Sequence, residues 1–332
     1  MIRMGIIGCG GMAEAHQQAF LGNDQVRVTA TVDTDSERAQ AAAEMFSHAR
    51  AATDYSTVID DVDAAILVLP HHLHHPVGID CLEAGCHVLL EKPMALSEPA
   101  CTDLLETARE YGRTLMIAYI QRFNPIVEEV KRLLDAEAYG EPFQVSIWTE
   151  QLTRYGEGHW ALDAEKLGGG QLFSHGCHYI DLLLWFLGEP TEGTHTGTNR
   201  GTPWMEREGT SQVNLKFENG ALGYHFGTWG ARASRLNYRI HAHCTDGLLD
   251  ADLTAGTLWG LDPAGHEEQL LDAPPGKHVE RQLDHFITCI ETGETPRTDP
   301  KSSIQSLRVI WRLYEAEAEG RVADLSGCGL EE

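Results

Sequence analysis

Over the first 119 or so residues, short apolar runs alternate with segments of helical pattern. Strands that alternate with helices in this way form parallel sheets covered on both faces. The sequence therefore predicts an α/β domain with a doubly wound parallel sheet. The expected strands are residues 4–7, 26–32, 64–69, 87–90 and 114–119, and the expected helices are residues 11–21, 35–47, 77–84 and 97–111.

The second half has a different pattern. Two alternating runs, 212–217 and 221–228, are joined by Glu218-Asn219-Gly220, and Asn-Gly indicates a hairpin because both turn residues must tolerate positive φ. We expect an α+β domain with a mainly antiparallel sheet. Further strands are expected at 142–150, 236–243 and 247–253, helices at 125–138, 171–187, 279–292 and 302–319, and a loop at 191–209.

Length and charge limit the function classes. A chain of 332 residues suggests about two domains, and we place them at 1–120 and 121–332. The formal charge of −25 argues against nucleic acid and anionic membranes as partners. No apolar run approaches the ~18 residues of a membrane span. Eight irregularly spaced cysteines and the lack of a secretory leader predict a cytoplasmic protein with reduced thiols.

A glycine motif follows the first expected strand. Gly8-Cys9-Gly10-Gly11-Met12-Ala13 has the spacing G-x-G-x-x-A at a strand–helix junction. The first glycine permits the tight turn, the second lets the backbone approach a pyrophosphate, and the alanine lets helix and strand pack closely. The N–H groups of the helix start then face the phosphates. The motif predicts a dinucleotide site.

An acidic residue ends the second expected strand at the distance this site requires. Asp33 lies about 20 residues after the glycine motif, followed by Thr34, with Arg38 nearby. Its carboxylate suits the two ribose hydroxyls of NAD and repels the 2′-phosphate of NADP, although Arg38 would soften that repulsion. NAD is therefore the expected cofactor and NADP the less favoured one. The competing interpretation is that Asp33 only caps the next helix.

Two further segments carry residues suited to proton and hydride chemistry. Lys92 follows a strand at the edge where open α/β sheets bind ligands, and Pro93 keeps it out of helical geometry. The glycine triplet 168–170 would let a ligand approach the backbone closely. The helix that follows the triplet carries His178 and Asp181. Imidazole can accept a proton from a hydroxyl near neutral pH. The alternatives are a surface lysine and a structural histidine.

Four motifs together resemble the Gfo/Idh/MocA oxidoreductases, the family of glucose–fructose oxidoreductase and inositol dehydrogenase. They are Gly8-Cys9-Gly10-Gly11, Glu91-Lys92-Pro93, Arg122-Phe123-Asn124-Pro125 and Gly168-Gly169-Gly170 with Gly176-Cys177-His178 and Asp181. The resemblance implies a Rossmann domain, then a domain with an open sheet whose outer face makes homodimers or homotetramers. It also implies NAD(P)-dependent hydride transfer at a secondary alcohol of a sugar, sugar derivative or inositol.

The resemblance assigns roles to individual residues. Lys92 would lie beside the nicotinamide and the reacting hydroxyl, and His178 would accept the proton. His71 stands where the family commonly has asparagine in a Pro-Asn-x-x-His run near the cofactor. Together with the residues above, the expected cofactor set includes Leu69, Pro70, His71, His74, Glu91, Lys92 and Arg122.

One position departs from the family pattern. Family dehydrogenases often carry an aspartate four residues after the last glycine, and this chain has Ser174 there. That aspartate commonly orients the histidine, so His178 would rely on another acid, on His175 or on Lys92. The expected substrate set comprises Lys92, Arg122, Trp148, Arg154, His159, Trp160, Ser174, His175 and His178, with Tyr179 a further candidate; ordinary core and surface roles compete for the aromatic and charged members.

Other functions stay open at this level. Histidines at 71–75 and at 175 and 178 suggest a metal, but a zinc site needs a fixed tetrahedral set with supporting ligands, so we expect none. A tightly held NAD could drive elimination, epimerisation or glycoside cleavage through transient oxidation. A cofactor-binding regulator without turnover is the third alternative.

Overall fold

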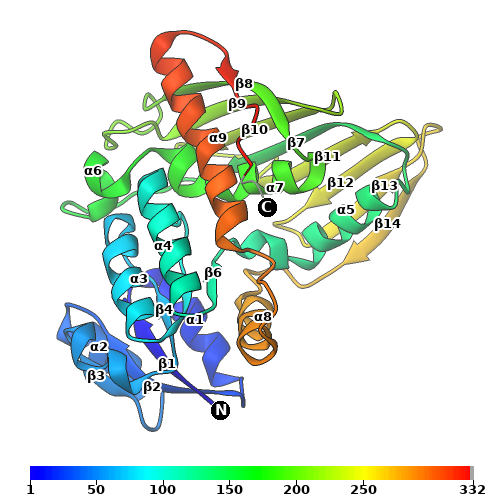
Figure 1. Cartoon of the computed structure of the whole chain (residues 1–332). Helices are drawn as coiled ribbons and strands as arrows, with labels where there is room; N and C mark the ends of the chain where they lie inside the picture. The colour runs from blue at the N-terminus through cyan, green and yellow to red at the C-terminus, as the bar shows by residue number, and fades with distance from the viewer. Residues whose placement is uncertain (330–332) are drawn as a thin grey trace. The chain divides into compact units, whose positions relative to one another are not determined.

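The computed structural model describes residues 1–329, which divide into two compact units (Figure 1). Unit 1 comprises residues 1–120 and 278–304, and unit 2 comprises 121–277 and the residues from 305 onward. The sequence expectation also placed a border after residue 120 but assigned 278–304 to the second domain. That segment groups with unit 1 because its helix α8 (Val279–Thr292) packs against α1 (Gly11–Leu21).

Unit 1 is built on a six-stranded parallel sheet, as the alternating pattern predicts. The strand order is β3-β2-β1-β4-β5-β6, so the order reverses between β1 and β4. Strand β4 is buried along its whole length, which explains its unbroken apolar run. The strands are β1 (Ile2–Ile7), β2 (Val26–Val32), β3 (Arg50–Ala52), β4 (Ala64–Leu67), β5 (His87–Leu90) and β6 (Leu115–Ile117), and the other helices are α2 (Ser36–Glu44), α3 (His74–Glu83) and α4 (Glu98–Glu110).

Unit 2 is built on a nine-stranded sheet with the order β14-β13-β12-β11-β7-β10-β9-β8-β15. Among the described strands of this sheet, only β7 and β10 pair in parallel and the other pairs are antiparallel, which confirms the expected mainly antiparallel sheet. The strands are β7 (Pro142–Glu150), β8 (Pro190–Thr198), β9 (Thr210–Phe217), β10 (Leu222–Thr228), β11 (Tyr238–Cys244), β12 (Gly247–Asp252), β13 (Thr257–Leu261), β14 (Glu267–Asp272) and β15 (Ala323–Asp324).

Two helices of unit 2 pack on this sheet and contact each other. Helix α5 (Pro125–Asp135) packs on β12, β13 and β14, and α7 (Cys177–Leu187) packs on β7 and β10. Asn124 caps α5 and Pro125 begins it, as the sequence predicts. The remaining helices are the short α6 (Ala164–Leu167) and the long α9 (Pro300–Glu319), whose first residues belong to unit 1.

The expected loop at 191–209 was wrong for its first half, which forms β8 and pairs with β9. The strand alternates as a strand should, but its inward positions are Gly193, His195 and Gly197 instead of apolar residues. Gly193 has little room, since a Cβ there would lie 2.8 Å from a Leu215 methyl carbon. The sequence therefore shows no apolar periodicity although His195 is buried.

No helix within residues 1–329 combines enough length with enough apolar character to cross a bilayer.

Candidate functional site

The glycine loop of unit 1 contains two kinds of glycine. Gly8 has φ +94° and donates its N–H to the Val32 carbonyl at 2.7 Å. A Cβ on Gly8 would lie 2.1 Å from the Val68 carbonyl oxygen, so packing alone requires glycine there. Gly10, the N-cap of α1, and Gly11 differ: among the described residues, no atom lies within 4 Å of a Cβ built on either. Open space at these two positions fits a pyrophosphate on the helix start.

The Asp33 carboxylate is fixed beside this loop. Its Oδ2 accepts the Cys9 backbone N–H at 2.9 Å, and its Oδ1 accepts the Asp35 N–H and the Arg38 guanidinium, each at 2.9 Å. The interpretation of Asp33 as the cap of α2 was wrong, because Asp35 is the N-cap and accepts the N–H groups of the first turn. Asp33 is therefore held beside the glycine loop by its own hydrogen bonds, while Thr34 and Arg38 are exposed.

The Glu-Lys-Pro segment follows β5 at the same edge of the sheet. The buried Glu91 places Oε1 3.0 Å from His16 Nε2, and its Oε2 accepts the Lys92 N–H at 3.3 Å. Burial opposes ionisation of Glu91, but the hydrogen bond and charge of His16 outweigh it and lower the pKa of the carboxyl. The Lys92–Pro93 bond is cis, and Lys92 is half-buried.

His74 joins the backbone on both sides of this segment. Its Nδ1 lies 2.7 Å from the Pro93 carbonyl oxygen and its Nε2 lies 2.9 Å from the Leu69 carbonyl oxygen. The ring is fully buried, which lowers its pKa, and it lies 5.6 Å from the His71 ring. The described contacts of His74 thus fix the loop that carries Lys92.

The candidate residues of unit 1 therefore lie at one sheet edge. Gly8 follows β1, Asp33 follows β2, Leu69 follows β4 and Lys92 follows β5, and these strands are parallel neighbours around the reversal between β1 and β4. In open α/β sheets this is where a nucleotide binds. The sequence prediction of a dinucleotide site and the sheet topology agree.

In unit 2, His175 and His178 lie on a continuous helical segment. A π-helical turn (Leu172–Gly176) precedes α7, which begins with Cys177. The Ser211 hydroxyl donates to Gln171 Oε1 at 2.5 Å, so the Gln171 amide nitrogen faces His175 Nδ1 at 3.4 Å. The His175 and His178 ring centroids are 6.2 Å apart. A fixed Gln171 therefore favours the His175 tautomer that carries its proton on Nε2.

The acidic residue one turn after His178 has a strong partner. Asp181 is fully buried, and it accepts Arg122 Nε and Nη2 at 2.7 Å each and Ser306 Oγ at 3.4 Å. Such bidentate pairs are among the stronger hydrogen bonds in proteins. Arg122 also lies over the Trp185 ring at 5.1 Å. These contacts give Arg122, expected to contact cofactor and substrate, a structural role within unit 2.

Two glycines of the triplet 168–170 are required by internal packing, a role that the sequence did not indicate. Gly168 ends α6 with φ +83°. A Cβ on Gly169 would lie 2.4 Å from Phe173 Cβ, and one on Gly170 would lie 2.1 Å from Glu208 Cδ. The last two glycines therefore admit the protein's own side chains. Sequence reasoning missed Glu208 because no motif surrounds it.

The expected substrate wall is divided within unit 2. Trp148 is on the face of the sheet opposite the one that α7 covers, 5.1 Å from the His241 ring, so it is not brought together with His178. Arg154 lies over the Trp204 ring at 4.9 Å, and His159 stacks on Tyr155 at 4.5 Å. Tyr155, Trp160 and Trp204 pack against one hydrophobic cluster, whose buried members are Ala161, Leu167, Met205 and Trp229.

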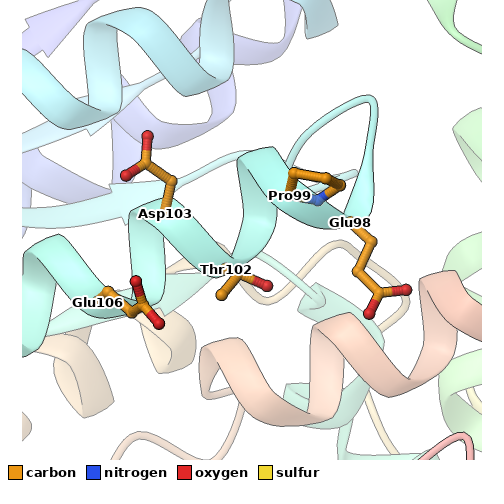
Figure 2. Close-up of a pocket in the computed structure, with 5 residues that line it drawn as sticks. All are labelled: Glu98, Pro99, Thr102, Asp103 and Glu106. Carbon is orange, nitrogen blue, oxygen red and sulfur yellow. The ribbon is translucent and has the colours of Figure 1, made fainter.

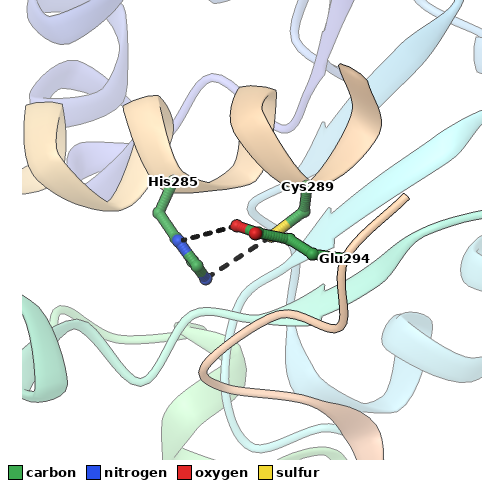
Figure 3. A group of neighbouring side chains, drawn as sticks. All are labelled: His285, Cys289 and Glu294. Carbon is green, nitrogen blue, oxygen red and sulfur yellow. Dashed lines mark hydrogen bonds and ion pairs between the residues drawn. The ribbon is translucent and has the colours of Figure 1, made fainter. Parts of the chain in front are cut away.

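Two other features lie in unit 1. A shallow pocket on α4 is lined by Glu98, Pro99, Thr102, Asp103 and Glu106 (Figure 2), and it includes none of the expected site residues. His285, Cys289 and Glu294 converge at the end of α8 (Figure 3). However, His285 Nε2 already accepts the Arg297 N–H at 2.9 Å, and burial raises the pKa of the Cys289 thiol to about 11. These contacts stabilise a helix end, and we base no metal site on them.

Comparison with known proteins identifies both halves. Residues 2–119 match the family described as "Oxidoreductase family, NAD-binding Rossmann fold", and residues 127–250 match the "GFO/IDH/MocA C-terminal domain". The D-xylose 1-dehydrogenase (NADP(+)) 2 of Haloferax volcanii is 27% identical over 97% of this chain and 99% of the relative. The inositol 2-dehydrogenase 2 of Saccharopolyspora erythraea is 32% identical over 67% of this chain and 65% of the relative.

A solved structure extends the likeness to the fold. The aldose-aldose oxidoreductase from Caulobacter crescentus, complexed with glycerol, superposes with a TM-score of 0.87 at 26% identity over 98% of this chain and 99% of that chain. The sheet order, the glycine loop and both family matches lead to one conclusion: the chain belongs to the Gfo/Idh/MocA family of oxidoreductases and carries its NAD(P)-binding Rossmann domain.

Proposed function

We propose that this protein is an NAD-dependent dehydrogenase that oxidises a secondary alcohol of a sugar, sugar derivative or inositol. The observation that carries the proposal is the sheet edge of unit 1, where open glycine positions, a fixed carboxylate and a strand-end lysine follow neighbouring strands. The names of the relatives, a xylose dehydrogenase and an inositol dehydrogenase, support the substrate class.

The residues of unit 1 suggest how NAD is held. The backbone at Gly10 and Gly11 would bind the pyrophosphate, and the Asp33 carboxylate would accept the ribose hydroxyls. A carboxylate opposes the extra phosphate of NADP, which supports NAD, whereas the Haloferax relative is named for NADP(+). Arg38 already pairs with Asp33 at 2.9 Å, so its charge is directed at that carboxylate.

The proposed chemistry needs a proton acceptor and a group that stabilises developing negative charge. The bound nicotinamide would supply the ring carbon that accepts hydride. Lys92 would donate a hydrogen bond to the reacting oxygen and stabilise the alkoxide as it forms. His178 would accept the hydroxyl proton. Since Ser174 replaces the common aspartate, the orientation of His178 would come from its helix.

We further propose that the outer face of the nine-stranded sheet joins copies of this chain. Its aromatic and charged side chains are half-buried: Trp148 contacts the Tyr224 and His241 rings, and Arg239 pairs with Asp250 and Asp252. Trp148→Glu would place a charge at the centre of this face, so light scattering should report a smaller assembly than for wild type. Gln18→Glu, at an exposed position of α1 in unit 1, is the control. An unchanged mass for Trp148→Glu would contradict the assignment.

Gly8 and Gly10 should respond differently to a methyl group. Gly8→Ala meets the Val68 carbonyl, so we expect the free energy of unfolding to fall by about 2 kcal/mol or more. Gly10→Ala meets no described atom, so stability should change by less than about 1 kcal/mol. Its NAD affinity should nevertheless fall about tenfold or more, as measured by calorimetry. Unchanged NAD affinity in Gly10→Ala would argue against this loop as the pyrophosphate site.

Asp33→Asn should reduce the preference for NAD. The amide keeps an acceptor for the Cys9 N–H but loses the charge that repels the 2′-phosphate and pairs with Arg38. We expect the ratio of kcat/KM for NAD to that for NADP to fall about tenfold, which is about 1.4 kcal/mol. Asp35→Asn, at the neighbouring cap, should leave the ratio unchanged. Equal changes of this ratio in the two variants would contradict an interaction between Asp33 and the ribose hydroxyls.

Lys92→Ala tests the dehydrogenase itself. NADH absorbance would be followed at neutral and mildly alkaline pH with a panel of sugars and inositols. We expect kcat to fall about a hundredfold or more while NAD affinity stays within about threefold. Lys216→Ala, which loses an exposed pair with Glu192, is the control. A fully active Lys92→Ala would refute the assignment, and substrate consumption without net NADH would favour transient oxidation.

A further inference from the structure

We propose that Glu208 and Tyr314 are positioning residues, which hold the start of the helical segment that carries His175 and His178. The inference deepens the proposed function, because it rests on the role of His178 there. All of these residues belong to unit 2.

Four consecutive N–H groups at this point are bound by two residues. The Tyr314 hydroxyl oxygen accepts the Gly170 and Phe173 N–H groups at 3.2 Å each. The Glu208 backbone carbonyl accepts the Gln171 N–H at 2.7 Å, and Glu208 Oε1 accepts the Leu172 N–H at 3.3 Å. A helix start leaves four N–H groups without intrahelical partners. Glu208 and Tyr314 thus satisfy the complete set, and the internal ladder begins with Ser174 N–H to the Gly170 carbonyl at 2.9 Å.

The two side chains also hold each other. The Tyr314 hydroxyl donates to Glu208 Oε1 at 2.5 Å. Burial raises the pKa of Tyr314 well above its usual range, so the phenol keeps the proton that it donates. With one donated and two accepted hydrogen bonds, the hydroxyl uses its whole capacity. A carboxylate at a helix start is also favoured by the helix dipole.

Neighbouring residues make room for this arrangement. Gly170 lets Glu208 reach the backbone, since a Cβ there would lie 2.1 Å from the carboxyl carbon. Tyr314 contacts the His195 ring edge to face at 5.1 Å, and His195 Nδ1 lies 2.7 Å from Glu317 Oε2. His195 and Glu317 are therefore neighbours of the pair formed by Glu208 and Tyr314.

The held backbone leads directly to the histidines. Gln171, whose N–H binds the Glu208 carbonyl, also places its amide nitrogen 3.4 Å from His175 Nδ1. His178 follows one turn later on the same segment. A shift of residues 170–173 would therefore move both rings together, and a displacement of about 1 Å at a reacting group can cost about a hundredfold in rate.

Tyr314→Phe is the first test, because it removes only the hydroxyl. We expect hydrogen exchange of the 170–173 amides to accelerate about tenfold or more, since two of the four lose their acceptor. We expect kcat to fall at least about tenfold with the KM for NAD unchanged. Tyr55→Phe, which loses a hydroxyl bond to Asp80 in unit 1, is the matched control. Exchange at 170–173 equal to that of wild type would overturn the proposal.

Glu208→Gln and Glu208→Ala separate positioning from general loss of structure. Glutamine keeps an oxygen for the Leu172 N–H and the Tyr314 hydroxyl, so most of kcat and slow exchange should be retained. Alanine should lose both. Glutamine and alanine variants with equal kcat and equal exchange would overturn the proposal. If wild type oxidises none of the panel, the proposed function has failed, and the exchange rates still decide whether the two side chains hold this segment.

The pH dependence of stability gives a readout specific to the carboxyl. Burial raises the pKa of Glu208, whose neighbours are Tyr314 and the Glu317 carboxylate. The folded state then binds more protons than the unfolded state between the unfolded value near 4.5 and the raised folded value. Wild-type stability should therefore decline with rising pH across this window relative to Glu208→Gln. Parallel curves for the two proteins would contradict an ionisable Glu208 at the helix start.

Discussion

The start of every helix leaves backbone N–H groups that need acceptors, and this constraint organises both candidate regions. At α1, Gly10 and Gly11 provide no side chains, and a Cβ at either would meet no described atom. At the segment before α7, Glu208 and Tyr314 occupy the corresponding positions completely. One helix start suits an anionic ligand from outside the chain, and the other is closed by the chain itself. The glycine loop before α1 therefore leaves its helix start open, whereas the glycine triplet before α7 lets the protein's own side chains satisfy the helix start.

This contrast explains which parts were predictable. The dinucleotide site follows from local patterns, since Gly8, Gly10 and Asp33 lie within one strand–helix–strand unit. The closure of residues 170–173 depends on Glu208 and on Tyr314, which is more than 140 residues distant from Gly170. A single sequence shows no signal for such a contact. The triplet itself was visible, but a glycine that admits a ligand and one that admits Glu208 look alike in sequence.

Strand β8 and the pair formed by Arg122 and Asp181 show the same limit. Periodicity identifies a strand through its apolar face, and β8 uses glycine and His195 on that face. The sequence places Asp181 one helical turn after His178. Arg122 and Ser306, which donate hydrogen bonds to Asp181, are 59 and 125 residues away. Spacing along one helix therefore did not indicate the hydrogen-bond partners that tertiary packing provides for Asp181.

Buried ionisable groups recur wherever a candidate catalytic residue must be held. Glu91 with His16 lies beside Lys92, Asp181 on the helix of His178 pairs with Arg122, and Glu208 lies at the start of that segment. Burying such groups costs desolvation free energy that an apolar core would avoid. Removing one partner, however, leaves the other buried and unsatisfied. Each pair therefore tolerates few alternative geometries. Such pairs contribute more to fixing the position of the candidate catalytic residues than to the stability of the fold.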